Sequence, residues 1–518
     1  MPDTFFVTTP IYYVNDVPHI GHAYTTVAAD ALARYHRLAG KSVLFITGTD
    51  EHGQKVQEAA RKRGISPQQH CDEMVLRYRE LWSALSISHD DFVRTTEERH
   101  KRVVRAILTS LYQKGDIYKT SYEGWYCVPD ERFWTEKDLD NHRCPECGRD
   151  VQQIRESNYF FRMGSYREWL IRYIEEHPDF ILPRTRRNEM LGFLRQPLTD
   201  LCISRPRQRL SWGIPIPFDE DYVTYVWFDA LINYVSTAGY LTRDERFLDL
   251  WSNAVYLIGK DILTTHCIYW PTMLRALGLN PPRTIFAHGW WTVEGQKMSK
   301  SLNNVVEPNQ LIARYGADAV RFFLLREGTF GLDADFSHRA FIHRVNSELA
   351  NDLGNLFNRT LAMTAKYFSG SIPSPSTADE ADRRLSETAM EAVRRVDAAM
   401  TEISFHKSLD AIWELVGMTN KYIDETAPWS LAKRSGAEER LGTVIYQVIE
   451  SLRFIAVLLF PFIPASAERM REALGIREPF NHRGLAALSR WGETIPGTTL
   501  TSIPQLFPRI ELSTEPFT

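Results

Sequence analysis

Hydrophobic and polar residues follow two different periods at the start of the chain. Phe5–Thr9 is a short run of aromatic and β-branched residues, which predicts a buried strand. From His19 onward the apolar residues recur at helical spacing, and Gly40 is placed to end that helix. Val43–Thr47 predicts a second strand. A strand, a helix and a strand in this order predict a parallel, doubly wound sheet.

The pattern changes again further along the chain. Residues 116–225 are rich in aromatic side chains and have few long helical periods, which predicts an inserted subdomain. Strand-like runs at 254–258 and 284–287 resume the α/β pattern, and helical periodicity from about residue 340 predicts a helix bundle. The expected division is an α/β domain in two halves (1–115 and 226–293), the insertion (116–225), a linking segment (294–345), the bundle (346–480) and an irregular tail (481–518).

Composition excludes several classes of protein. With 44% hydrophobic residues among 518, the chain should fold, and a net charge of −4 gives no global field for nucleic acid. Six cysteines are too few for a disulfide framework. We see no signal peptide, and the longest apolar run, Phe454–Ile463, is too short to cross a membrane. We therefore expect a soluble, cytoplasmic protein without a membrane partner.

Two short motifs are suited to holding phosphate. His19-Ile20-Gly21-His22 puts two imidazoles on one face of a helix start, where backbone N–H groups and the helix dipole favour anions. Gly21 lets a flat group such as adenine lie against the backbone. Lys297-Met298-Ser299-Lys300-Ser301 puts two mobile ammonium groups on a short loop. Surface histidines and a solvated basic turn are the simpler alternatives. Together the motifs predict a site for a nucleoside triphosphate, assembled by the fold.

These motifs and several others resemble those of class I aminoacyl-tRNA synthetases, and of the methionyl-tRNA synthetase family in particular. The resemblance covers residue 5 to about 465. Its other motifs are Thr9–Asn15, Gly48–Gly53, Tyr225–Ala230, Gly259–Ile262, His288–Trp290 and Ala427–Trp429. It implies an α/β fold: a Rossmann-like parallel-sheet catalytic domain with an inserted connective subdomain, followed by an all-α helix bundle. Residues 294–345 would then be a stem-contact segment that carries the KMSKS loop.

The resemblance implies a methionine–tRNA ligase with a two-step reaction. Methionine attacks the α-phosphate of ATP, which should arrive with Mg²⁺, and pyrophosphate leaves. The methionyl group then passes to the 3′-terminal adenosine of tRNA. His19 and His22 would hold the phosphates, while Lys297 and Lys300 would clamp the pyrophosphate. The other residues implied at the ATP site are Gly21, Gly259, Asp261, His288 and Gly289.

The implied amino-acid pocket agrees with the chemistry of a thioether. Its members are aromatic and apolar with a few polar tips, which suits a flexible side chain whose sulfur favours aromatic edges. Asp50 would pair with the substrate ammonium. The remaining members are Pro10, Ile11, Tyr13, Trp227, Leu231, Tyr234, Ile262, His266 and Trp270.

Three other functions stay open at this point. A synthetase for another apolar amino acid or for cysteine is disfavoured by the pocket aromatics, and the short insertion argues against an editing enzyme for a branched-chain amino acid. A catalytically silent tRNA-binding protein is disfavoured by the intact phosphate motifs and Asp50. A small-molecule nucleotidyltransferase would not need the helix bundle.

In the bundle, the resemblance implies contacts with the anticodon of tRNA(Met), including initiator tRNA. Asn355 and Arg359 lie one turn apart and would bond base edges, while Trp429 would stack on a splayed base. A solvated helix face and ordinary core are the alternatives. No domain for dimerisation follows the bundle, so we expect a monomer.

The inserted subdomain contains a cysteine knuckle. Cys144-Pro145-Glu146-Cys147-Gly148 matches half of a zinc site, and Cys127-Val128-Pro129-Asp130 would be the other half. Many relatives have cysteine where this chain has Asp130, whose hard oxygen is a weaker ligand among sulfurs. A site of three cysteines and an aspartate, a partial site and a metal-free remnant are all compatible with the sequence. Any Zn²⁺ here would be structural.

Overall fold

Five residues near the N-terminus form a central strand of the largest sheet. In the computed structural model, which describes residues 3–127, 132–134, 136–145, 147–298, 304–480 and 485–511, β1 (Thr4–Thr8) lies between two parallel neighbours. The main strand order is β2 (Tyr12–Tyr13), β3 (Ser42–Asp50), β1, β13 (Ala254–Gly259), β14 (Thr284–His288) and β8 (Ile181–Leu182), and β4 (Asp91–Arg94) also pairs with β3. The predicted Rossmann-like parallel sheet is therefore confirmed.

Each face of this sheet packs against its own hydrophobic core. Phe5 and Val7 of β1 belong to one buried cluster, and Phe6 between them belongs to the other, as the alternation of a strand requires. α1 (Ile20–Leu38) and α3 (Pro67–Ala84) contribute to the first cluster. The second includes residues of α4 (Glu98–Gln113), α7 (Val226–Leu231), α8 (Asn233–Ala238), α9 (Glu245–Ser252) and α10 (Trp270–Ala276).

The inserted stretch is partly antiparallel sheet and partly helix. β5 (Ile117–Cys127) pairs with β6 (Arg132–Trp134) and β7 (Gln152–Phe161), which pairs with β9 (Leu201–Cys202). Two helices that the sequence pattern did not predict, α5 (Arg167–Glu176) and α6 (Arg184–Phe193), flank β8 in the chain. Because β8 pairs with β14, the chain returns to the main sheet before the insertion is complete.

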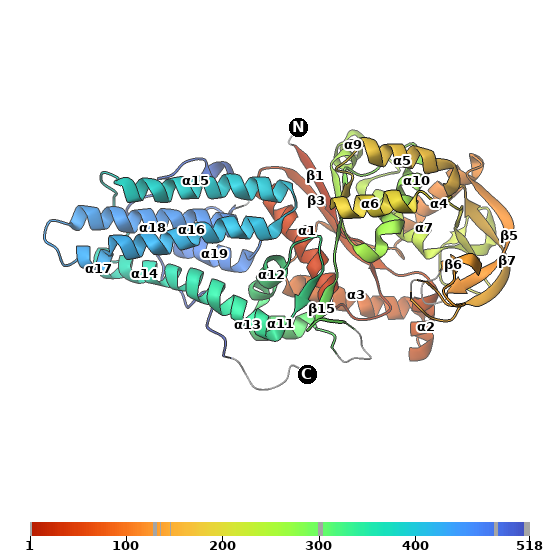
Figure 1. Cartoon of the computed structure of the whole chain (residues 1–518), viewed down its shortest axis with the longest axis horizontal. Helices are drawn as coiled ribbons and strands as arrows, with labels where there is room; N and C mark the ends of the chain where they lie inside the picture. Colours follow the sequence, from red (N-terminus) through yellow and green to blue (C-terminus); the bar gives the residue numbers. More distant parts are fainter. Residues whose placement is uncertain are drawn as a thin grey trace.

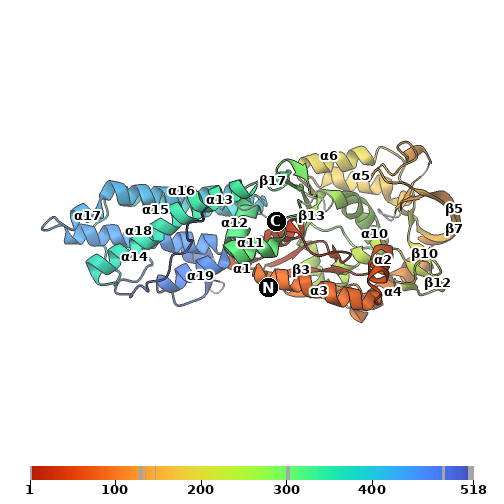
Figure 2. The same ribbon diagram turned by 90° about the horizontal axis from the view of Figure 1, so that it is seen from below.

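The predicted helix bundle forms the other end of the molecule. Both ribbon views show it extending away from the α/β part along the long axis (Figures 1 and 2). Its longest members are α15 (Glu380–Thr401), α16 (Phe405–Thr426) and α18 (Glu438–Leu459). By length and composition α18 could cross a membrane, but its apolar window is wholly buried inside the protein. The helix is therefore accounted for as the core of the bundle.

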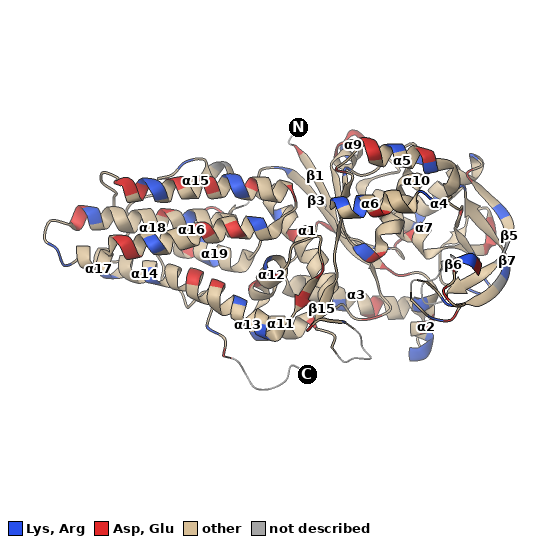
Figure 3. Ribbon diagram, viewed as in Figure 1, with Lys and Arg blue, Asp and Glu red and all other residues tan. Residues whose placement is uncertain are grey.

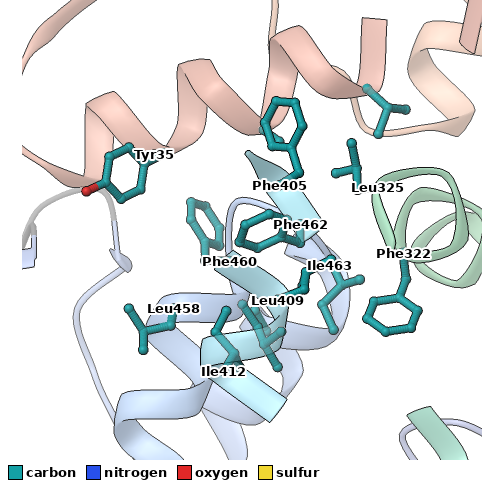
Figure 4. Packing of buried hydrophobic residues seen from close by; sticks show 14 of the residues in the cluster. Tyr35, Phe322, Leu325, Phe405, Leu409, Ile412, Leu458, Phe460, Phe462 and Ile463 are labelled. Carbon is teal, nitrogen blue, oxygen red and sulfur yellow. The ribbon is translucent and has the colours of Figure 1, made fainter. Parts of the chain in front are cut away.

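A buried ion pair joins α1 to a helix that comes just before the bundle in the chain. Arg321 of α12 (Ala317–Arg326) pairs with Asp30 of α1 at 2.7 Å, and both side chains are inaccessible to solvent. The guanidinium also donates to the carbonyl oxygens of Leu85, Pro461 and Phe462. Apolar side chains from α1, α12, the start of α16 and the end of α18 pack around this junction, as Figure 4 shows for Tyr35, Phe322, Phe405, Phe460 and Phe462. Removing either partner would leave the other charge buried and unpaired, so loss of this pair should destabilise the junction.

Candidate active site

The two histidines of the first motif cap the N-terminus of α1. His19 is the N-cap residue, and its Nδ1 accepts the N–H of Gly21 at 3.1 Å. The Nδ1 atom of His22 accepts the N–H of His19, also at 3.1 Å, and the two rings stack with centroids 3.8 Å apart. This is a capping box in which imidazoles replace the usual hydroxyl and carboxylate.

The capping geometry fixes the tautomer of both rings. Because each Nδ1 accepts a hydrogen bond from the backbone, the ring proton must sit on Nε2, which remains able to donate. Burial lowers the pKa of His19, and burial together with the neighbouring ring of His19 lowers the pKa of His22 well below its ordinary value. The helix start therefore presents neutral N–H donors and not imidazolium cations.

A single cavity of about 1090 Å³ opens beside this helix start. It lies at the carboxyl ends of β1, β3, β13 and β14, the edge where doubly wound sheets bind ligands. The predicted site residues that line it are Pro10, Ile11, Tyr13, His19, Gly21, His22, Asp50, Trp227, Leu231, Tyr234, Gly259, Asp261, Ile262, His266, His288, Gly289 and Lys297. The structure thus brings the first motif and Lys297–Met298, the described part of the second, to one cavity.

One predicted residue, Trp270, is placed differently, and another, Lys300, cannot be compared. Trp270 does not line the cavity: it is fully buried, with its ring centroid 5.9 Å from that of Tyr234 and its Nε1 donating to the hydroxyl of Tyr256. Trp270 therefore packs behind Tyr234, which lines the cavity, and does not face the cavity itself. Lys300 lies outside the described residues.

One end of the cavity is apolar with a short polar relay. The hydroxyl of Tyr234 bonds His266 Nε2 at 2.7 Å, and His266 Nδ1 bonds the carbonyl oxygen of Ile262 at 2.9 Å. A carbonyl only accepts, so Nδ1 carries the proton and the hydroxyl of Tyr234 donates to Nε2. Burial lowers the pKa of His266 to about 4, which keeps this ring neutral. His266 lies in a π-helical turn, Thr265–Tyr269, and such turns recur at functional sites.

The opposite end is built from the ends of β13 and β14. A Cβ on Gly259 would lie 2.5 Å from Oδ1 of Asp261, so a side chain there would displace this carboxylate. His288 donates from Nδ1 to the carbonyl oxygen of Gly289, and its Nε2 accepts the hydroxyl of Thr25 on α1 at 2.7 Å. This bond joins α1, in the first half of the α/β domain, to β14, in the second half.

The buried carboxylate of Asp229 holds in place the side of the cavity that lies near Asp50. Asp229 accepts from His52 Nδ1 at 2.6 Å and from His100 Nε2 at 2.7 Å, and all three side chains are buried. Burial raises the pKa of Asp229, but the two imidazoles outweigh it and leave the pKa at about 2. The carboxylate thereby ties α7, which carries Trp227, to the loop that follows Asp50.

Sequence reasoning missed several residues of the cavity. Thr25, Lys55, Tyr78 and Trp290 all line it. Thr25 and Tyr78 look like ordinary helix positions, so only the tertiary fold could have identified them. Trp290 belongs to the His288–Trp290 motif of the resemblance, so the signal was present although no site role was predicted for this residue.

The cysteine knuckle lies in the inserted part of the chain. The sulfur atoms of Cys127, Cys144 and Cys147 all lie within 4.8 Å of one another, and those of Cys127 and Cys147 are 3.5 Å apart. The N–H of Gly148 bonds the carbonyl oxygen of Cys144, which closes the turn. Asp130, the predicted fourth ligand, is outside the part of the chain that the structure describes.

The three predicted anticodon residues lie on one end of the bundle. Asn355 and Arg359 belong to α14 (Asn355–Phe368), and Trp429 belongs to the short helix α17 (Pro428–Leu431). The guanidinium of Arg359 lies 6.0 Å from the ring centroid of Trp429, whose side chain is 42% exposed. Lys, Arg, Asp and Glu are interspersed along the bundle, so any nucleic-acid contact must be local (Figure 3).

Comparisons with known proteins are in agreement over nearly the whole chain. A family profile described as "tRNA synthetases class I (M)" matches residues 5–361, and one described as "Anticodon binding domain of methionyl tRNA ligase" matches residues 372–515. A methionine–tRNA ligase of Caldanaerobacter subterraneus is 50% identical, over 99% of this chain and 80% of its own length. One from Clostridium tetani is 49% identical over 98% and 79%, respectively.

Solved structures are similar to the same extent. The methionyl-tRNA synthetase of Mycobacterium tuberculosis in complex with methionyl-adenylate superimposes with a TM-score of 0.94. It is 40% identical and covers 98% of this chain and 100% of its own.

Proposed function

The chain belongs to the methionyl-tRNA synthetases, class I enzymes that join methionine to tRNA with ATP, and on that premise we propose how its residues divide the reaction. The observation that carries the assignment is the single cavity lined by His19, His22, Asp50, Asp261 and Lys297. The family match does not support the alternatives of another synthetase specificity or a silent tRNA binder.

Methionine would occupy the apolar end of the cavity. Its thioether would lie against Ile11, Trp227 and Leu231, with Tyr234 and His266 as polar tips. The ammonium would pair with Asp50, which is 5% exposed at the carboxyl end of β3. These contacts would point the carboxylate toward the nucleotide.

ATP, entering as its Mg²⁺ complex, would occupy the other end. Asp261 would accept a ribose hydroxyl, and Gly21 would leave room for adenine, with Gly289 lining the same end of the cavity. The neutral Nε2–H donors of His19 and His22 would bond phosphate oxygens as charge develops at the α-phosphate. Lys297 and Lys300 would hold the leaving pyrophosphate as point charges. Catalysis is then positioning and charge stabilisation without a covalent enzyme intermediate.

The first test is exchange of labelled pyrophosphate into ATP across a panel of amino acids. Methionine should drive exchange, and leucine and cysteine should not. His22→Ala should slow the exchange roughly 100- to 1000-fold, the loss typical of one transition-state donor, with little change in KM for methionine. His177→Ala, on the exposed end of α5, is the matched control. Exchange with leucine or cysteine only, or an undiminished rate in His22→Ala, would contradict the assignment.

We also propose that Asn355, Arg359 and Trp429 read the anticodon of elongator and initiator tRNA(Met). The exposed ring of Trp429 offers a stacking face, and Arg359 lies beside it to reach a base edge.

Trp429→Ala should lower kcat/KM for aminoacylation of tRNA(Met) about 10- to 100-fold, because base–aromatic stacking contributes about 1–3 kcal/mol. Trp429→Phe should retain most of the activity. Pyrophosphate exchange, which needs no tRNA, reports whether each variant is folded. Normal charging of both tRNAs by Trp429→Ala would remove this residue from the interface.

The knuckle fits a structural Zn²⁺. Thiolates around tetrahedral zinc lie about 3.8 Å apart for Zn–S bonds of about 2.3 Å, and the sulfur atoms found here are clustered at that scale. We propose that Cys127, Cys144 and Cys147 hold the metal, with Asp130 as the fourth ligand.

Elemental analysis of the purified protein should find about one zinc per chain. Cys144→Ser should lose it, while Cys71→Ala, at a buried thiol outside the knuckle, should keep it. Equal zinc in both variants, or none in the unaltered protein, would favour the metal-free remnant. The monomeric state and the cytoplasmic location stay predictions.

A further inference from the structure

Trp290 is an exposed aromatic side chain at the mouth of the cavity. It follows His288 and Gly289 at the end of β14, and 43% of its surface is accessible. Three charged groups surround its indole. Nε1 donates to Asp261 Oδ1 at 3.2 Å, and the ammonium groups of Lys260 and Lys297 lie 4.2 and 5.3 Å from the ring centroid.

A second set of contacts fixes the position of Trp290. Lys260 Nζ bonds both carboxylate oxygens of Asp333 at 2.6 and 2.7 Å, and Asp333 Oδ1 accepts the backbone N–H of Trp290 at 2.8 Å. A Cβ on Gly289 would lie 2.3 to 2.4 Å from the backbone of Leu332 and Asp333, so the chain closes tightly there. The ammonium of Lys260 is therefore engaged with Asp333 and with the indole face.

These contacts connect Trp290 to the residues proposed to bind the ribose and the pyrophosphate part of ATP. Asp261 is the proposed partner of the ribose, and Lys297 is the proposed partner of pyrophosphate. With Oδ1 of Asp261 held by the indole N–H, the carboxylate has one orientation and its other oxygen remains for a hydroxyl. A cation–π contact at an exposed site is weak, so Lys297 can leave the ring when a triphosphate offers a stronger partner.

We propose that Trp290 is a positioning residue for ATP: its indole N–H orients Asp261 toward the ribose, and its ring holds Lys297 at the cavity mouth until the triphosphate arrives. Lys260 and Asp333 hold Trp290 in place. The inference rests on the proposed roles of Asp261 and Lys297, and it assigns a role to Lys260, for which the sequence offered none.

The test removes the indole N–H and the ribose hydroxyls separately. Trp290→Phe keeps an aromatic face but cannot donate, so KM for ATP in methionine-dependent exchange should rise about 3- to 10-fold while KM for methionine stays constant. With 2′-deoxy-ATP or 3′-deoxy-ATP, whichever lacks the hydroxyl bound by Asp261, this penalty should vanish, because the oriented carboxylate has lost its partner. Trp290→Phe should likewise add nothing in an Asp261→Ala background.

The contact between Lys297 and the ring of Trp290 is tested by a separate measurement, that of kcat. Trp290→Leu should lower kcat about 2- to 5-fold beyond Trp290→Phe, and this excess should disappear in a Lys297→Ala background. Trp169→Phe is the matched control. The guanidinium of Arg275 lies 5.3 Å from the ring centroid of Trp169, but Trp169 does not line the cavity. Its kinetics should match those of the unaltered protein.

Three outcomes would overturn the proposal. An equal Trp290→Phe penalty with ATP and both deoxy analogues would mean that the ring contacts adenine directly and does not act through Asp261. Parallel increases in both KM values would indicate a general structural role. An unchanged KM for ATP in Asp261→Ala would remove the premise about the ribose. Failure of the assigned function is distinguishable, because the unaltered protein would then show no methionine-dependent exchange.

Discussion

The parallel pairing of β1 with β13 is the constraint on which the active site depends. Phe6, Val7 and Thr8 lie opposite Ala254, Val255 and Tyr256, although almost 250 residues separate them in the chain. Parallel strands end at the same edge, so this register brings the helix start at His19 next to Gly259 and Asp261. β14 extends the same edge and adds His288, whose bond to Thr25 closes the two halves on each other. Neither half contains the cavity alone.

The chemistry at that edge depends on neutral donors in a fixed orientation. The capping bonds at the start of α1 hold both imidazoles with Nε2–H outward, and burial keeps their pKa values low. A neutral donor needs no proton from solvent, and it stabilises charge as that charge appears in the transition state. Positive charge comes from a different source, Lys297 of β16 (Gln296–Lys297), which lines the same cavity. Trp290 lies where the two meet.

Part of this organisation was available in the sequence. Apolar periodicity placed β1, α1 and β3 to within a few residues, because their side chains pack on a sheet whose faces are both buried. The family resemblance named half of the residues that line the cavity. By contrast, β8 gave no strand signal: two residues in the insertion join the sheet only through their tertiary pairing with β14. The imidazole capping box, the place of Trp270 behind the wall and the buried pair of Arg321 with Asp30 also depend on contacts that no local pattern encodes.

A crystal structure of the protein with methionine and a non-hydrolysable ATP analogue tests the central claim most directly. The account predicts one nucleotide in the cavity, with phosphate oxygens within hydrogen-bonding distance of the Nε2 atoms of His19 and His22. A ribose hydroxyl should lie within hydrogen-bonding distance of Asp261, and the ammonium of Lys297 should point toward the β- and γ-phosphates. A nucleotide bound with its phosphates remote from both histidines, or with Lys297 directed into a separate crevice, would contradict it.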